Sequence, residues 1–484
     1  MNAGRQLAGV FLGLAGLASL GVVTGCSSSM TNGASTVAAS TTAAPMLVTV
    51  SDAPLNNILM AKVTISAITL GTGSATGAVS VLSQPATVEL SSLGGVQEPI
   101  ELTNLALGTY TSATVTVSSA QVTYLNASGV ATTGMATLTS PTVTVALTPA
   151  LMVASATTEQ HLQFGFDLTK SFDLTGNVLS FTPAITTLAA AVSSEDGGDR
   201  NLVATGSVVS VTPTAITVQC GDSGRQFTYV INSSTALPTG VMLASLQTGM
   251  IVRIQGQTQP DGTIVAVSIT PESTTGMSGQ NEDGAKGIIV SVTTSGGLVT
   301  GFTMVPREAF GMMTMSNLPM TGTINVALSS ATVYGLPQEA QQVGLTSAMF
   351  TNAELFPGQS VMVTGVADST GTVAAQQVTL GAVGLGGVLA GVPQGNAPAY
   401  TFGLTLTSIG ALANPKSLPT LTLNVATEAS TEYNHGMTAA GFAALTAGTA
   451  VEVNGYVLLD PMGNYLLTAQ QIGQVQAPES PEGN

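Results

Sequence analysis

Residues that could carry out covalent or metal chemistry are scarce in this chain of 484 residues. It holds two Cys and two His, which argues against a zinc site with several such ligands. Nine Lys and Arg stand against 25 Asp and Glu, a formal net charge of −16. We expect no nucleic-acid partner, because phosphate binding needs clustered cations. No G-x-S-x-G elbow, phosphate-binding loop, dinucleotide fingerprint or H-E-x-x-H motif is present, so we predict no enzyme activity, cofactor or metal.

Cys26 stands at the end of an apparent export signal. Residues 1–5 are a short basic start and Leu7–Val23 are an apolar run. The run ends in Val23-Thr24-Gly25-Cys26, which resembles the bacterial lipobox. The resemblance implies cleavage before Cys26, a diacylglycerol on its thiol and an acylated amine, which together anchor a protein stably in a membrane. Ser27 in place of Asp favours the outer membrane by the same resemblance. The alternatives are an ordinary signal with a chance Cys, or a retained span.

The other Cys and one His are expected to be structural. Cys220 follows Ile216 and Val218 at a spacing of two, which predicts a side chain packed in a core. His161 alternates with apolar residues such as Leu162, so we expect it on the exposed face of a strand.

Three further features have a simple and a functional interpretation. His435 lies in a predicted turn, far in sequence from the other His. The Met-rich segment Met312–Met320 favours a flexible apolar loop, with a copper site as the alternative. Asp52 is expected to fix a turn through backbone hydrogen bonds, and Asp167 to pair with Lys170, with ligand binding by these acids as the alternative.

The elements that would position these residues are strands. Residues 46–192 alternate polar and apolar side chains at period two, with Gly, Pro, Asn and Ser between the runs. No window sustains an amphipathic helix. Roughly eight short strands separated by turn signals predict a β-sandwich.

Four motifs in this region resemble a known family. They are Val50-Ser51-Asp52-Ala53-Pro54, Val88-Glu89-Leu90, Leu107-Gly108-Thr109-Tyr110 and Phe166-Asp167-Leu168-Thr169-Lys170-Ser171. They are similar, in this order, to motifs of domain of unknown function 4382, found in secreted bacterial and archaeal proteins. That family carries no established catalytic residues, so the resemblance implies a fold and an exported location.

The second half of the chain repeats one pattern three times. The copies are Leu246-x-x-Gly249-x-x-Val252-x-Ile254-x-Gly256, Leu355-x-x-Gly358-x-x-Val361-x-Val363-x-Gly365 and Leu445-x-x-Gly448-x-x-Val451-x-Val453-x-Gly455. Each is preceded by a strand that we expect to open at a Gly: Gly206, Gly287 and Gly387. A small barrel fits this pattern. The copies resemble domain of unknown function 5666, which implies OB-like barrels, and the longer insertions of the second and third copies set them apart from the first.

One position of the repeat varies in chemistry. The flanking apolar residues, such as Val252 and Ile254, are predicted to point inward. Between them stand Arg253, Met362 and Glu452, which we expect to point outward and to share no function.

The predicted fold class is therefore all-β, an N-terminal β-sandwich followed by three small OB-like β-barrel repeats. The predicted domains are a signal peptide (1–25), a disordered tether (26–45), the sandwich (46–192), three barrels (202–272, 286–380 and 381–475) and a disordered tail (476–484). We expect a lipid-anchored cell-envelope lipoprotein with a non-catalytic binding or structural role, whose partners are the membrane and an envelope protein or polysaccharide. The alternatives are a glycan- or polymer-binding surface module and a hydrolase with unrecognised acidic residues.

Overall fold

A computed structural model describes residues 42–474 except 54–56, 73–76, 94–95, 127, 175–178, 192–201, 221–224, 239, 272–283, 311–321, 369–371, 407–411, 413–420, 434–436 and 461. Strands dominate these residues, which confirms the all-β prediction. Within the described ranges, no helix is long and apolar enough to cross a membrane.

The first domain is built from two sheets that share one apolar core. One sheet has the order β13-β10-β1-β5, and the other has β3-β2-β6-β7 with β4 paired to β2 and β9 paired to β6. The strands of the first sheet are β1 (Ala43–Ala53), β5 (Glu98–Ala106), β10 (Gln160–Asp167) and β13 (Ile185–Ala191). Those of the second are β2 (Ile58–Gly71), β3 (Val79–Ser80), β4 (Ala86–Glu89), β6 (Gly108–Leu125), β7 (Ala131–Met135) and β9 (Thr142–Val153). A small third sheet holds β8 (Thr137–Leu138), β11 (Phe172–Asp173) and β12 (Ser180–Phe181), and the short helices are η1 (Leu90–Ser92) and α1 (Leu168–Ser171).

β1 begins earlier than the sequence predicts. The tether was expected to extend to residue 45, but Ala43–Pro45 already belong to the strand and face Asn104–Ala106 of β5. Backbone pairing with β5 orders these small residues, whose composition alone favours disorder.

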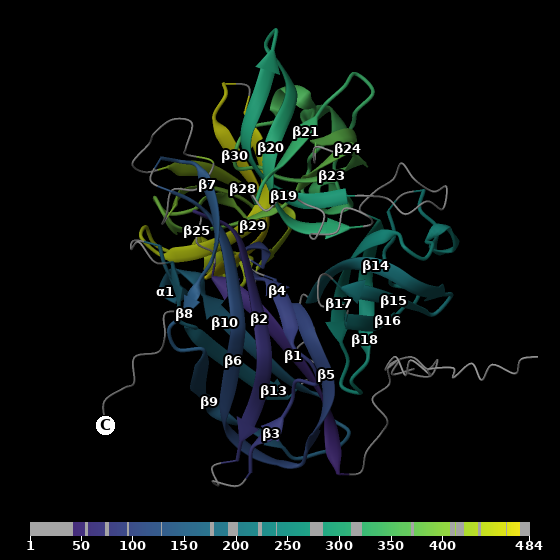
Figure 1. Cartoon of the computed structure of the whole chain (residues 1–484), viewed down its shortest axis with the longest axis vertical. Helices are drawn as coiled ribbons and strands as arrows, with labels where there is room; N and C mark the ends of the chain where they lie inside the picture. Colours follow the sequence, from purple (N-terminus) through teal and green to yellow (C-terminus); the bar gives the residue numbers. More distant parts are fainter. Residues whose placement is uncertain are drawn as a thin grey trace, which may run out of the picture. The chain divides into compact units, whose positions relative to one another are not determined.

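Each of the three repeats folds as a closed five-stranded barrel (Figure 1). The first runs β14-β15-β16-β18-β17, and β14 pairs again with β17. Its strands are β14 (Leu202–Thr212), β15 (Ala215–Cys220), β16 (Arg225–Val230), β17 (Ile251–Thr258) and β18 (Ile264–Pro271), with η2 (Leu243–Ser245) before β17. β16 and β18 are parallel and the other pairs are antiparallel, as in an OB fold.

The second and third repeats have the same strand order despite their insertions. The second closes as β19-β20-β21-β24-β23 and the third as β25-β27-β28-β30-β29. The second holds β19 (Gly284–Ser295), β20 (Leu298–Phe310), β21 (Ile324–Ala327), β22 (Val333–Gly335), α2 (Gln338–Gln342), η3 (Ser347–Met349), η4 (Asn352–Glu354), β23 (Ser360–Ala367) and β24 (Thr372–Gly381). The third holds β25 (Val383–Leu389), β26 (Gln394–Asn396), β27 (Ala399–Leu406), β28 (Thr422–Tyr433), α3 (Ala439–Ala443), β29 (Ala450–Leu459) and β30 (Tyr465–Gln474). The predicted three OB-like barrels are thus confirmed.

Two positions of the repeat require glycine because of the conformation or the close approach of the backbone. Gly249, Gly358 and Gly448 have φ of +88°, +98° and +84°, a left-handed conformation that costs other residues energy. The Gly expected to open each barrel lies instead inside its first strand. There, a Cβ on Gly287 would stand 2.0 Å from the carbonyl oxygen of Val305, so only Gly permits the two strands to approach.

The barrels use the apolar positions of the repeat as predicted. Val252, Val361 and Val451 are fully buried, and so are Ile254, Val363 and Val453. The position between them is not simply solvent-exposed, which corrects the prediction. Met362 is 3% exposed and packs on Ile251 of the first barrel, while Arg253 and Glu452 are partly buried. Packing between domains therefore covers this outer face.

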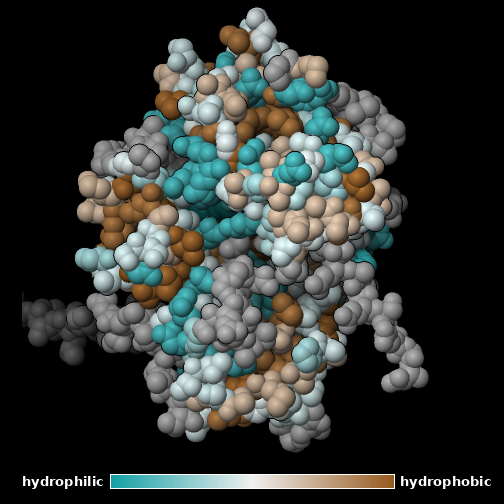
Figure 2. All heavy atoms as spheres, turned by 180° about the vertical axis from the view of Figure 1, so that it is seen from behind, coloured by the Kyte–Doolittle hydropathy of each residue, from teal (hydrophilic) through white to brown (hydrophobic). Residues whose placement is uncertain are grey.

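The surface is low in charge and partly apolar. Figure 2 shows hydrophilic residues gathered in a band with hydrophobic patches beside it. Exposed apolar side chains include Met152, Leu188 and Met462.

Candidate functional site

Several sequence candidates lie outside the described residues. These are the predicted lipid attachment site Cys26, His435 and the Met-rich segment Met312–Met320.

Cys220 packs in the core of the first barrel. It is 2% exposed, among apolar residues of the same barrel. Burial raises the pKa of its thiol, so the reactive thiolate is disfavoured. This confirms the structural interpretation of Cys220.

His161 is buried, which contradicts the sequence prediction. It is 3% exposed, and its Nε2 lies 2.9 Å from Oγ1 of Thr49 in the neighbouring strand β1. The face of the sheet that carries His161 is covered by the first barrel, where Leu47 joins the barrel core. Alternation along one strand could not predict this, because the covering surface comes from another domain.

Acids of two family-like motifs lie at one edge of the sandwich. β1 and β10 are parallel, so both end at the same edge, and Asp52 and Ala53 stand beside Phe166 and Asp167. Asp167 caps α1 and forms an ion pair with Lys170, with 2.6 Å between Oδ2 and Nζ. Partial burial alone would raise the pKa of Asp167. Hydrogen bonds from Lys170 and Thr169 outweigh it, so the pKa of Asp167 is lowered.

Asp52 differs from its predicted role in a turn. It is 5% exposed, and neither carboxylate oxygen has a hydrogen-bond partner among the described residues. Burial raises the pKa of Asp52 well above its usual value, and the negative charges of Glu452, Glu89 and Asp167 act in the same direction. The positive charge of Arg307 opposes this rise, and burial is the largest cause.

The neighbours of Asp52 form a charged cluster between domains. Arg307, 6% exposed, donates from Nε to the carbonyl oxygen of Leu59 at 2.6 Å. Oε1 of Glu89 accepts a hydrogen bond from the backbone N–H of Ala61 at 2.8 Å. Burial raises the pKa of Glu452 in the third barrel to about 7. In the part of the chain that the structure describes, no group of three His, Cys, Asp or Glu is placed to hold a metal.

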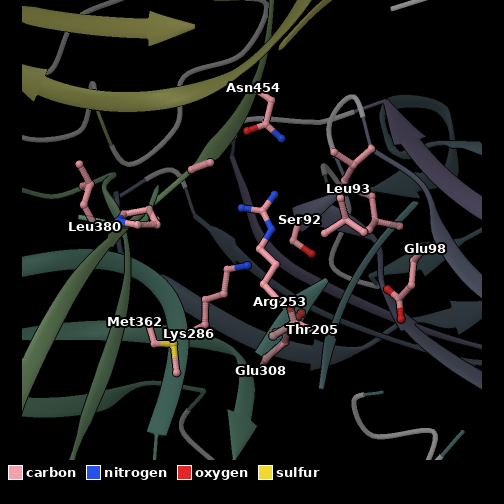
Figure 3. Close-up of a pocket in the computed structure, with 15 residues that line it drawn as sticks. Ser92, Leu93, Glu98, Thr205, Arg253, Lys286, Glu308, Met362, Leu380 and Asn454 are labelled. Carbon is pink, nitrogen blue, oxygen red and sulfur yellow. The ribbon is translucent and has the colours of Figure 1, made fainter. Parts of the chain in front are cut away.

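A polar pocket is lined by residues of all four β domains (Figure 3). One of them, Glu308, follows Arg307 of the cluster in the sequence. The cavity volume of the pocket is about 70 Å³. The polar lining comes from Ser92 and Glu98 of the sandwich, Thr205 and Arg253 of the first barrel, Lys286 and Glu308 of the second, and Asn454 of the third. The apolar lining includes Leu93, Val96, Val203, Met362 and Leu380. Pockets with an apolar wall and a few polar groups are typical of small-molecule sites.

Strand register explains how the second barrel contributes. Lys286 of β19 stands opposite Glu308 of β20 on one side and Met362 of β23 on the other, so the three share a face. Arg253 of β17 stands opposite Thr205 of β14 in the first barrel. The pocket thus lies where the outer faces of these two barrels meet the sandwich and the third barrel.

This pocket was not predicted from the sequence. A signal was present in the composition, since only nine Lys and Arg occur in 484 residues and two of them, Arg253 and Lys286, line it. Arg253 carries a rare positive charge at the variable position of the repeat, and this could have indicated it as a candidate binding residue. No periodicity predicts that residues from four domains meet.

Comparison with known families identifies one part of the chain. Residues 205–270 match the family model of a domain of unknown function, DUF5666. This DUF5666 segment spans most of the first barrel and contains Thr205 and Arg253. The match agrees with the resemblance predicted for the first repeat.

Solved structures that align with this chain do so at low identity and low TM-score. The single-stranded DNA-binding protein of Thermus aquaticus aligns at 14% identity over 42% of this chain and 96% of its own, with a TM-score of 0.17. The small single-stranded DNA-binding protein of Streptomyces coelicolor aligns at 16% identity over 20% and 94%, with a TM-score of 0.14. Drosophila Unr CSD456 aligns at 12% identity over 58% and 100%, with a TM-score of 0.13. These scores are too low to support an inference. No curated protein matches the chain.

Proposed function

We propose that this chain is a lipid-anchored lipoprotein of the bacterial cell envelope with a non-catalytic binding role. The anchor is the lipid on Cys26, the location is the outer membrane, and the Ser-, Thr- and Ala-rich tether holds the folded part away from the bilayer. The similarity of the sandwich motifs to domain of unknown function 4382 supports an exported location.

One observation carries the binding role: a polar pocket of about 70 Å³ at which the sandwich and all three barrels meet. Arg253 and Lys286 line it beside the amide of Asn454 and the hydroxyl of Ser92. These groups can orient a ligand through charge and hydrogen bonds without a chemical step.

A glycan- or polymer-binding surface module is the second candidate. The hydroxyl and amide groups of Ser92, Thr205 and Asn454 favour a polar partner such as an envelope polysaccharide. The lining of this pocket contains no aromatic residue, and sugar sites often use aromatic platforms, so this candidate has less support. A hydrolase has less still, because the buried Asp52 does not line the pocket.

The anchor is tested by membrane fractionation of Cys26→Ser expressed in a Gram-negative bacterium. We expect the wild-type chain in the membrane fraction with incorporated labelled palmitate, and the variant released and unlabelled. Cys220→Ala is the matched control, because it removes the other thiol and should leave both properties unchanged. An unaltered distribution of Cys26→Ser would rule out the lipoprotein.

A further inference from the structure

We infer that the pocket shared by the four domains binds a small monocarboxylate, with Arg253 and Lys286 as its two cationic anchors. This inference names the ligand class for the binding role proposed above and rests on that role. It does not depend on the lipid anchor, which concerns a different part of the chain.

Two cations from different barrels point into the same cavity. Arg253 comes from β17 of the first barrel and Lys286 from β19 of the second, so only the packing of the barrels brings them together. In Figure 3 the guanidinium of Arg253 and the ammonium of Lys286 both point into the space below Asn454. Lys286 forms no ion pair and no side-chain hydrogen bond with the residues that the structure describes.

The balance of charge around the pocket selects a single negative charge. Glu98 and Glu308 also line it, so the two cations and two acids sum to zero. In Figure 3 the carboxylate of Glu98 lies well away from the two cationic head groups, while Glu308 stands beside Lys286 on the neighbouring strand. A monoanion gains from both cations, whereas the divalent form of phosphate brings a second charge into a lining that already contains two acids.

The shape of the pocket favours a carboxylate with a short apolar body. A planar carboxylate matches the fork of the Arg253 guanidinium, and the Lys286 ammonium can donate to the same oxygens. Met362, Leu380 and Val203 supply an apolar wall on which an aliphatic chain can pack. A volume of about 70 Å³ would hold roughly five water molecules, which suits a short acid such as butyrate.

Both an aliphatic acid and a sugar acid carry a carboxylate that could bind in this way. The experiment distinguishes these two ligands. Binding to the full-length chain in detergent is measured by calorimetry with butyrate, glucuronate, butyramide and phosphate. We expect saturable binding of butyrate, weaker binding of glucuronate, whose ring lacks an apolar surface of this kind, and none of butyramide or phosphate.

Variants then locate the site. Lys286→Gln and Arg253→Gln should each lower the affinity for butyrate about tenfold or more, because each removes a charge-assisted hydrogen bond. Lys170→Gln is the matched control, since it removes a cation whose side chain is 63% exposed on the sandwich, and it should leave the affinity unchanged. Circular dichroism melting shows whether each variant folds.

A measurement on the wild-type chain covers the case in which a variant does not fold. With ¹³C-methyl-labelled methionine, butyrate should shift the Met362 resonance, assigned by its loss in Met362→Leu. The inference is overturned if no carboxylate binds saturably, if butyramide binds equally well, or if the Met362 resonance and the Arg253 and Lys286 variants do not respond. If glucuronate binds more tightly than butyrate, the ligand is still a carboxylate, but it is a sugar acid and not an aliphatic acid. None of these outcomes depends on whether Cys26→Ser is released from membranes.

Discussion

Arg225 of the first barrel and Glu101 of the sandwich form a largely buried ion pair, with 2.8 Å between Nη1 and Oε2. The two side chains are 14% and 11% exposed. Oε2 of Glu101 also accepts hydrogen bonds from the backbone N–H and the hydroxyl of Ser83, at 2.8 and 2.7 Å. Arg225 donates in addition to the carbonyl oxygen of Gln84. The pair therefore joins two domains through an ion pair and several hydrogen bonds.

We expect Arg225→Met to reduce the free energy of unfolding by roughly 3 kcal/mol, because it leaves the carboxylate of Glu101 buried without its cation. Chemical denaturation measures this loss. Lys170→Met, which breaks the exposed pair with Asp167, should cost at most about 1 kcal/mol. Equal losses in the two variants would show that the interdomain pair is solvated in solution.

The inward position of the repeat should carry stability in every copy. Val252→Ala, Val361→Ala and Val451→Ala each truncate a fully buried side chain and should each cost about 1–3 kcal/mol through lost burial and a cavity. Ser210→Ala, an exposed change on β14, should stay within about 0.5 kcal/mol. A Val252 variant as stable as the Ser210 variant would contradict the assigned facing of β17.

Substitution by alanine should destabilise the protein to different extents at two of the left-handed glycines of the repeat. Gly448→Ala meets no atom within 4 Å, so only its φ of +84° opposes the change, at a cost of about 1–2 kcal/mol. Gly358→Ala adds a Cβ placed 2.5 Å from Cγ of Leu412 and should cost more. Thermal melting ranks the two variants, and the reverse order would contradict the contact with Leu412.

Glu452 should make the protein more stable in mildly acidic solution. Its pKa is about 7 in the folded chain, against 4.5 as the ordinary value. Between these pH values the folded state binds more protons than the unfolded state, so the free energy of unfolding falls as the pH rises from about 4.5 to about 7, and levels off above that. The total change from Glu452 is on the order of 3 kcal/mol. Asp52, whose pKa is also raised, adds to the fall.

Denaturant unfolding at pH values from about 5 to about 8 measures this dependence. Glu452→Gln should flatten the curve, because the amide does not ionise, and should raise stability at the alkaline end. Glu428→Gln, at an exposed position of the same barrel, is the control and should keep the wild-type slope. A Glu452→Gln curve as steep as that of the wild type would show that the carboxylate is solvated.

The interiors of the domains could be predicted from local pattern. Alternation at period two placed Cys220, Val252 and Ile254 on buried faces, because each side chain of a strand faces one of two sides and each barrel closes over its own apolar side. The repeated Gly positions marked left-handed turns and close strand contacts, since these requirements arise within one barrel. The threefold recurrence of that pattern then predicted three barrels despite unequal insertions.

The sites depended on tertiary structure. Local pattern placed His161 on an exposed face and Asp52 in a turn, yet both are buried, because the surfaces that cover them belong to segments far away in sequence. The same packing brings Arg253 to Lys286, and Glu452 near Asp52. The sequence by itself determined which side of each strand is apolar, since that depends on neighbouring residues alone. Only the tertiary structure decided which polar sides are covered and which charges meet, since that depends on how separate domains pack.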